Sequence, residues 1–172
     1  TQRLIAALSA PMAEGVLYEV DMRLRPSGNK GPVATRITSF AKYQREEAWT
    51  WEHMALTRAR VITGPAELKS RVEHAIRAAL LRPRDEAKLA ADVLDMRQRI
   101  AAEKGTDDIW DLKQVRGGLV DVEFIAQYLQ LLHAPSHPQV LDQSTIGAYQ
   151  RLQVAGLLAP EHADVLIPAT RL

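Results

Sequence analysis

The sequence has 172 residues, of which 47% are hydrophobic and 25% charged, and its net charge is +1. This balance is typical of a soluble globular protein of one domain or two small ones, and it excludes a disordered or collagen-like chain. No apolar run is long enough to span a bilayer and no signal peptide opens the sequence, so we expect a cytoplasmic protein without membrane contact. The absence of cysteine excludes disulfides and thiolate metal sites, and the 5% of aromatic residues argues against a nucleic-acid partner.

The N-terminal part predicts a helix and then a β-hairpin. Residues 1–10 have helical character up to Pro11. Because they lack an initiator methionine and resemble the interior of a helix, we expect the chain to be part of a longer protein. Apolar side chains alternate over 16–24, which predicts a strand. After the Gly- and Pro-rich loop 25–32, residues 33–37 are expected to form the partner strand.

From residue 38 onward the chain is helical in character. Pro83 separates two long amphipathic segments, of which the second carries an apolar stripe at helical spacing from Leu89 through Val93 and Met96 to Ile100. The expected segments are a helix from Thr38 or Ser39 to Trp51, a short helix or turn over 52–56, an extended piece over 58–62, and helices over 66–82, 85–104, 119–133, 142–155 and 160–168.

These elements together predict an α+β fold that is mostly α, with a small β-hairpin followed by a helical bundle. The domain boundary is expected at Gly64, which gives domains over 1–64 and 65–172. Basic residues outnumber acidic ones by nine to six in the first domain, and the excess lies close to the loop 25–32. This distribution favours local binding of a small anion over a groove for a long polyanion.

The predicted strand 16–24 holds the first candidate site. Asp21 shares a face with Glu19 and Arg23 because strand side chains alternate, and Arg25 follows just beyond the strand. A carboxylate binds Mg²⁺ and arginines clamp phosphate oxygens, so this grouping is typical of a phosphoryl- or nucleotidyl-transfer site. The alternative is an exposed strand face whose charges pair across neighbouring strands.

Residues 49–60 form the second candidate site. Two tryptophans, the Glu52-His53 pair and the arginines Arg58 and Arg60 lie in this short stretch. The alternative is a packed helix whose tryptophans fill the core and whose arginines extend to solvent. The Glu-His pair is not a zinc motif, since no second histidine follows at i+4.

The third candidate is the start of the apolar helix over 119–133, which carries Asp121 and Glu123. One explanation for these acids is that they complement the helix dipole. The other is that carboxylates beside an apolar core need partners, because an unpaired buried charge is costly. We expect at least one of them to form an ion pair with an arginine from residues 20–60, which joins the helical part to the β-element beside Asp21. The candidate partners are Arg23, Arg25, Arg58 and Arg60, with Lys113 and Arg116 nearer in sequence.

Taken together, these segments resemble a known family. Motifs of the glutamine synthetase adenylyltransferase/adenylyl-removing enzyme family are similar, in type and order, to Tyr18–Gly28, Tyr43–Gln44, Ala48–His53, Ala59–Val61 and Gly117–Ile125. Each motif is short, but their order over most of residues 12–132 is specific. The family enzyme has two copies of a polymerase-β-like nucleotidyltransferase unit. One copy adenylylates a tyrosine of glutamine synthetase, and the other removes the AMP by phosphorolysis.

The resemblance is greater to the adenylylating, C-terminal copy, because of Ser27 and the segment Ala48–His53. It implies that residues 1–64 are the C-terminal part of such a nucleotidyltransferase core. Asp21 then matches the third metal-binding carboxylate, and Arg23 and Arg25 are expected at the phosphate charge. Supporting roles are expected for Glu19, Glu52, Arg58, Arg60, Asp121 and Glu123.

The resemblance also implies the chemistry. Mg²⁺ is the implied cofactor and ATP the substrate, and the tyrosine hydroxyl attacks the α-phosphorus in line while pyrophosphate leaves. The family's Gly-Ser turn and Asp-x-Asp pair, which supply two of three metal-binding carboxylates, have no counterpart in the sequence. Since Asp21 alone cannot complete a metal pair, we expect the chain to be inactive by itself. The implied partners are glutamine synthetase and a PII signalling protein.

Other hypotheses remain open. In one of them, the helical part, 65–172, is a regulatory module that binds a signalling protein or a neighbouring domain. In another, the chain belongs to the adenylyl-removing half. A third is a helical bundle without a site. Supplying the missing Gly-Ser/Asp-x-Asp segment separates these hypotheses, because it restores Mg²⁺-ATP binding only to a catalytic core.

Overall fold

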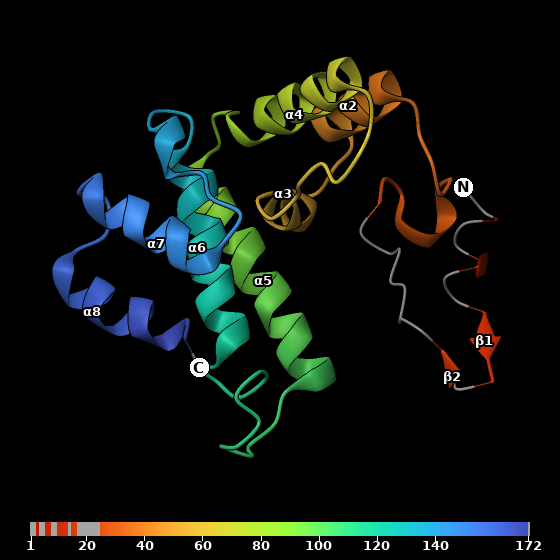
Figure 1. Cartoon of the computed structure of the whole chain (residues 1–172). Helices are drawn as coiled ribbons and strands as arrows, with labels where there is room; N and C mark the ends of the chain where they lie inside the picture. Colours follow the sequence, from red (N-terminus) through yellow and green to blue (C-terminus); the bar gives the residue numbers. More distant parts are fainter. Residues whose placement is uncertain (1–2, 4–5, 8–9, 14, 17–24, 172) are drawn as a thin grey trace. The chain divides into compact units, whose positions relative to one another are not determined.

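The computed structural model describes residues 3, 6–7, 10–13, 15–16 and 25–171 (Figure 1). The described part is mostly α-helical with one small β-hairpin, which confirms the predicted fold class. The chain divides into two compact units, Thr1–Ala48 and Trp49–Leu172. The expected boundary at Gly64 lies inside the second unit, and as a domain boundary of the whole protein it stays a prediction.

The described part of the first unit contains two short strands, a 3₁₀ turn, the helix α2 and three helical residues near the N-terminus. Strands β1 (Pro11–Met12) and β2 (Gly15–Val16) pair in antiparallel fashion. The structure therefore has a hairpin earlier in the chain than the predicted one. The predicted strand 16–24 lies beyond Val16 outside the described residues, and of the predicted helix 1–10 residues 3, 6 and 7 are described as helical.

The partner strand predicted over 33–37 is wrong. Residues 33–36 have no regular structure, and α2 (Ile37–Glu46) begins where the strand was expected to end, after the turn η1 (Gly28–Lys30). Ile37, Phe40 and Gln44 are spaced three and four residues apart, and Gln44 is buried. This helical spacing outweighs the local β-propensity of the preceding residues.

The single helix predicted from residue 38 to Trp51 is also wrong, because the chain forms two helices there. The first, α2, ends at Glu46, and α3 (Thr50–Leu56) begins after Trp49. Trp49 has an extended backbone, with ψ 162°, which interrupts the helical path. The extended piece predicted over 58–62 has no strand structure and follows hydrogen-bonded turns at the end of α3.

The second unit is a bundle centred on α6 (Leu119–His133). This helix packs against α3, α5, α7 and α8 (Figure 1). Its bounds agree with the predicted helix, and the other helices differ from their predicted ranges by a few residues at most. The remaining elements are α4 (Ala66–Leu80), α5 (Glu86–Lys104), η2 (Pro138–Val140), α7 (Thr145–Val154) and α8 (Pro160–Ala169).

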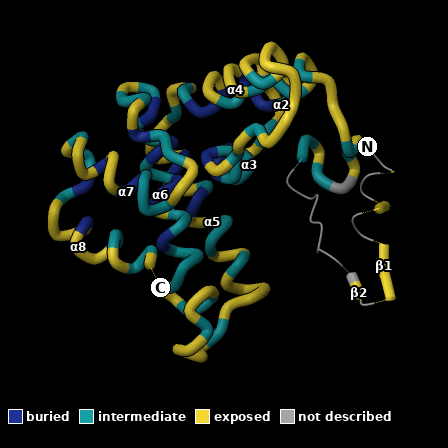
Figure 2. Tube along the Cα trace, in the orientation of Figure 1, coloured by how far each residue is buried: buried dark blue, intermediate teal, exposed yellow. Residues whose placement is uncertain are grey.

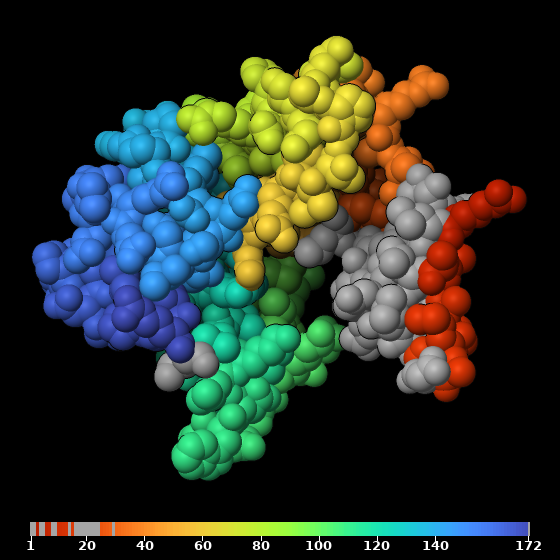
Figure 3. Space-filling model, in the orientation of Figure 1, coloured from red at the N-terminus to blue at the C-terminus, as the bar shows by residue number. Residues whose placement is uncertain are grey.

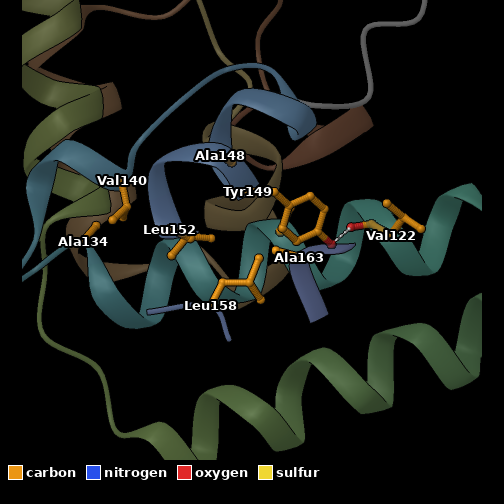
Figure 4. Packing of buried hydrophobic residues seen from close by; sticks show 9 residues of the cluster. Val122, Ala134, Val140, Ala148, Tyr149, Leu152, Leu158 and Ala163 are labelled. Atoms are coloured by element: carbon orange, nitrogen blue, oxygen red, sulfur yellow. Dashed lines mark hydrogen bonds between the residues drawn. The ribbon is translucent and has the colours of Figure 1, made fainter. Parts of the chain in front are cut away.

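Two apolar clusters hold the bundle together, and both use α6. One joins α6 to η2, α7 and α8 around the fully buried Tyr149 and Leu152. The Tyr149 hydroxyl donates to the Val122 carbonyl at 2.6 Å (Figure 4). The other cluster joins α3, α4, α5 and α6, and it contains the stripe residues Leu89 and Val93. Figure 2 shows buried positions gathered along α6.

The connector between α5 and α6, residues 105–118, projects from the bundle (Figure 3). It is polar, as predicted, but it exposes Trp110, whose relative exposure is 82%. Among the helices of the described residues, none combines the length and the apolarity that a membrane span requires.

Candidate functional site

The centre of the predicted site lies outside the described residues. Glu19, Asp21 and Arg23 belong to the stretch 17–24, so their predicted roles are not tested by the structure. Within the described ranges, no group of three or more acidic or histidine side chains is placed to hold a metal ion. Asp21 lies outside these ranges and stays the predicted Mg²⁺ ligand.

The loop that follows this stretch is described, and it folds back on itself. The Gly28 amide donates to the Arg25 carbonyl at 2.8 Å, and Arg25 Nε donates to the Gly31 carbonyl at 3.3 Å. A Cβ on Gly31 would lie 2.0 Å from the Pro26 carbonyl oxygen, so only glycine fits there. Ser27 has a φ of 60°, in the left-handed region. One nitrogen of Arg25 thus fixes the turn that begins at this residue.

Glu52 acts at the start of α3. Its carboxylate accepts a hydrogen bond from the Trp49 amide at 2.9 Å, which satisfies a backbone donor that the first turn of a helix leaves free. The neighbouring Thr50 hydroxyl donates to the Asp92 carboxylate of α5 at 2.5 Å. This hydrogen bond, supported by Lys88, holds the pKa of Asp92 below its ordinary value despite partial burial. Together these contacts fix the start of α3 on α5.

The packed-helix alternative for residues 49–60 is correct only in part. His53 and Met54 are buried, with exposures of 7% and 2%. Trp51 is half-buried, and Trp49 is 70% exposed, so the tryptophans do not fill the core.

Arg58 follows α3 and pairs with the third candidate segment. Its Nη1 donates to Glu123 Oε1 of α6 at 2.5 Å. This confirms the predicted ion pair between an acid of α6 and an arginine from residues 20–60. Because Arg58 belongs to the second unit, the pair lies within the helical bundle and does not join it to the β-element as expected. The side chains are 51% and 41% exposed, so the pair contributes only about 0.2–1 kcal/mol. It orients the end of α3 on α6 more than it stabilises the fold.

Asp121 forms a more enclosed ion pair, with Arg97 of α5. Arg97 Nε donates to Asp121 Oδ1 and its Nη2 to Oδ2, while the Gly117 amide donates to Oδ2 at 2.6 Å. The two charged side chains are only 16% and 22% exposed. Burial raises the pKa of Asp121, but the hydrogen bonds from Arg97 and Gly117 outweigh it, so that the pKa lies below its ordinary value. Asp121 thus joins α5, the connector and α6.

The sequence did not indicate Arg97 as the partner of Asp121. The helical spacing does indicate that Arg97 is partly buried, because it lies four residues after Val93 and three before Ile100, on the side of the apolar stripe. An arginine on the buried side of a helix needs an acceptor. Its Nη1 is buried and has no hydrogen-bond partner in the described part of the chain.

Arg60 lies apart from these ion pairs in the described structure. It lines a cavity of about 550 Å³ formed by the segment after α3, by α4 and by residues 141–143. No hydrogen bond or ion pair joins it to another described residue, so its predicted supporting role stays a prediction.

The fold and these contacts define a helical bundle that follows a small β-containing unit. Two family models match such a chain. One, described as glutamate-ammonia ligase adenylyltransferase, matches residues 1–75, and the other, described as GlnD PII-uridylyltransferase, matches residues 87–172. Both descriptions name nucleotidyltransferases, which is the class that the resemblance implies.

Curated relatives narrow this class. A bifunctional glutamine synthetase adenylyltransferase/adenylyl-removing enzyme of Rhodopseudomonas palustris (strain TIE-1) is 59% identical over all 172 residues. Enzymes of the same name from Xanthobacter autotrophicus and Bradyrhizobium diazoefficiens are 58% and 55% identical over the whole chain. The chain belongs to the bifunctional glutamine synthetase adenylyltransferase/adenylyl-removing enzyme family, which confirms the resemblance. It spans 17% of the length of each of these relatives.

Proposed function

We propose that the chain is part of the adenylylating half of an enzyme that transfers AMP from ATP to a tyrosine of glutamine synthetase. Residues 1–64 form the C-terminal part of the catalytic core, and the helical bundle follows it. The observation that carries the proposal is the identity of 54–59% with enzymes of this name over every residue of the chain. The adenylylating half is favoured by Ser27 and by the segment Ala48–His53.

In this proposal Asp21 is a metal ligand, and Arg23 and Arg25 lie at the phosphates of ATP. Mg²⁺, when bound, neutralises phosphate charge. The bond between the tyrosine oxygen and the α-phosphorus forms, the bond to pyrophosphate breaks, and the hydroxyl proton is lost. The fold-back of Arg25 Nε onto Gly31 supports a positioning role for Arg25, because it shapes the turn directly after the strand.

The bundle holds α3, the first helix after the first unit, in place. The bond from Thr50 to Asp92 and the Arg58–Glu123 pair attach α3 to α5 and α6, and the Glu52 cap fixes the first turn of α3. Since α3 follows the first unit directly in the chain, these contacts fix the first helix of the second unit in place. We propose further that the enzyme is cytoplasmic and that glutamine synthetase and a PII protein are its partners.

A second candidate function is a regulatory module. It is favoured by the match of residues 87–172 to the GlnD PII-uridylyltransferase model, since that family differs from the one that matches residues 1–75. In that case the bundle binds a signalling protein or a neighbouring domain and makes no contribution to AMP transfer.

The test uses the longer enzyme that contains this chain. Asp21→Asn keeps the shape of the side chain and removes its charge, and Asp164→Asn, the same substitution at an exposed acid of α8, is the matched control. AMP incorporation into glutamine synthetase and phosphorolytic AMP removal are measured separately. We expect Asp21→Asn to lose adenylylation at least 100-fold and to retain removal, with Asp164→Asn close to wild type. Loss of removal alone assigns the chain to the other half, and two unchanged activities refute the catalytic role of Asp21.

A further inference from the structure

We propose that the cavity between the end of α3, α4 and residues 141–143 binds a small organic anion, with a phosphate or carboxylate group on an apolar body. All of its lining residues belong to the second unit. The site contains none of the residues proposed to bind ATP, so this inference does not depend on the proposed function.

The size and floor of the cavity suit a small molecule. Its volume is about 550 Å³, within the range of roughly 300–1,000 Å³ typical of ligand pockets. Ile76 and Leu80, four residues apart on α4, form an apolar floor with Leu56 and Leu141. Leu80 is 4% exposed and belongs to the core, so the floor is a fixed surface.

Two guanidinium groups at the cavity have no partner among the described residues. Arg60 comes from the segment after α3 and Arg77 from α4, and the structure gives neither of them a hydrogen bond or ion pair with a described residue. Arg151 of α7 also lines the cavity, but it differs because its Nη2 donates to Asp142 at 2.9 Å and its Nη1 to the Leu141 carbonyl at 3.1 Å. Arg60 and Arg77 therefore keep their donors for a ligand, and guanidinium donors match phosphate and carboxylate oxygens.

The walls are held in place without a ligand. Gln143 Nε2 donates to the Ala59 carbonyl at 3.0 Å, which ties the segment 141–143 to the segment after α3. The two segments lie side by side in Figure 3, in light blue and gold. The Asp142 amide donates to Oε1 of the buried Gln130 at 2.8 Å, which anchors the same segment to α6. Such preorganisation lowers the entropic cost of binding.

The charge balance at the cavity favours an anion. Its lining contains the acids Glu73 and Asp142 beside three arginines. Asp142 is paired with Arg151. Among the described residues that line the cavity, this leaves two guanidinium groups and one carboxylate, that of Glu73, without an ion pair. The remaining charge is positive, and the Glu73 carboxylate is available to accept a hydrogen bond from a ligand hydroxyl.

The test is a titration of the ¹⁵N-labelled chain with phenyl phosphate, benzoate, inorganic phosphate and phenol, followed by NMR at the arginine Nε–H groups. We expect saturable binding of phenyl phosphate or benzoate with shifts at Arg60 and Arg77, weaker binding of inorganic phosphate, and none of phenol. The tighter of the first two ligands identifies the acid group. Arg60→Ala and Arg77→Ala should each weaken binding at least tenfold, because each removes charge-assisted hydrogen bonds. Arg71→Ala, an exposed arginine of α4 outside the cavity, should change it less than twofold.

A second measurement covers the longer enzyme, where other anion sites exist. Phenylglyoxal modification is mapped by mass spectrometry, and phenyl phosphate or benzoate should protect Arg60 and Arg77 but not Arg71. The proposal is overturned if neither acid binds or protects at about 10 mM, or if Arg77→Ala and Arg71→Ala bind equally well. Binding of an acidic peptide at these arginines without binding of either small acid also overturns it, because the cavity is then a protein-docking groove.

Discussion

Replacing Asp121 and Glu123 separately by alanine compares how much each ion pair of α6 contributes to the free energy of unfolding. Asp121 accepts hydrogen bonds from Arg97 through both of its oxygens and from the Gly117 amide. Glu123 accepts one from Arg58. Both acids lie near the start of the same helix, so a general effect of removing an acid from the helix N-terminus is similar for the two.

The expected magnitudes differ because the exposures differ. Breaking a fully buried ion pair costs about 3–5 kcal/mol, since the remaining charge is left without a partner. The Arg97–Asp121 pair keeps 16% and 22% of its side-chain exposure, so water relieves part of this cost. We therefore expect Asp121→Ala to destabilise the chain by about 2–3 kcal/mol. For Glu123→Ala, whose pair is roughly half-exposed, we expect about 0.2–1 kcal/mol.

The assay is urea unfolding of the two variants and the wild type, followed by circular dichroism at 222 nm. With unchanged slopes, the midpoints give the difference in the free energy of unfolding. The single variant Arg97→Ala and the double variant with Asp121→Ala complete a double-mutant cycle. We expect a coupling energy between the two side chains of more than about 1 kcal/mol. The reasoning fails if the Asp121 and Glu123 variants lose equal stability, or if the cycle shows no coupling.

Three further predictions concern the bundle. Tyr149→Phe removes the buried hydrogen bond to the α6 carbonyl and should cost about 1–2 kcal/mol in urea unfolding, whereas Tyr128→Phe should cost less than about 0.5; equal losses would contradict this. The pKa of Asp121 is lower in the folded than in the unfolded chain. The stabilisation by this carboxylate is therefore present above ~pH 4 and is lost as the pH falls through the folded-state pKa. The wild type should accordingly lose more stability on acidification than Asp121→Asn. Arg84 donates to carbonyl oxygens at the end of α4, and burial lowers its pKa to about 10. Arg84→Met should therefore cost about 1–3 kcal/mol of stability and Arg71→Met almost nothing. Thermal melts that do not distinguish the two variants refute the capping role.

Local sequence signals were sufficient for the bundle. Helix α6 begins directly after Gly117-Gly118, and its continuous apolar run made its extent predictable. The break between α2 and α3 was not predicted, because the extended backbone at Trp49 depends on the cap formed by Glu52. The pattern of apolar residues alone does not contain that information.

Partners of charged side chains were only partly predictable. Arg58 was among the candidates for the acids of α6, because the need for a partner follows from the apolar helix around Glu123. Asp121 instead pairs with Arg97, which depends on how α5 packs against α6. Helical periodicity shows which face of each helix is buried, but not the relative translation of the two helices. The cavity at Arg60 has the same origin, since three distant segments meet there.

The most direct measurement of the central proposal is AMP incorporation into glutamine synthetase by two proteins. One is the 172-residue chain alone, and the other is the chain extended at its N-terminus by the Gly-Ser and Asp-x-Asp segment of the family. With ATP and Mg²⁺, we predict no incorporation by the first and both Mg²⁺-ATP binding and incorporation by the second, abolished by Asp21→Asn. Incorporation by the chain alone, or an extended protein that still binds no Mg²⁺-ATP, would contradict the proposal that these residues complete an adenylylating core.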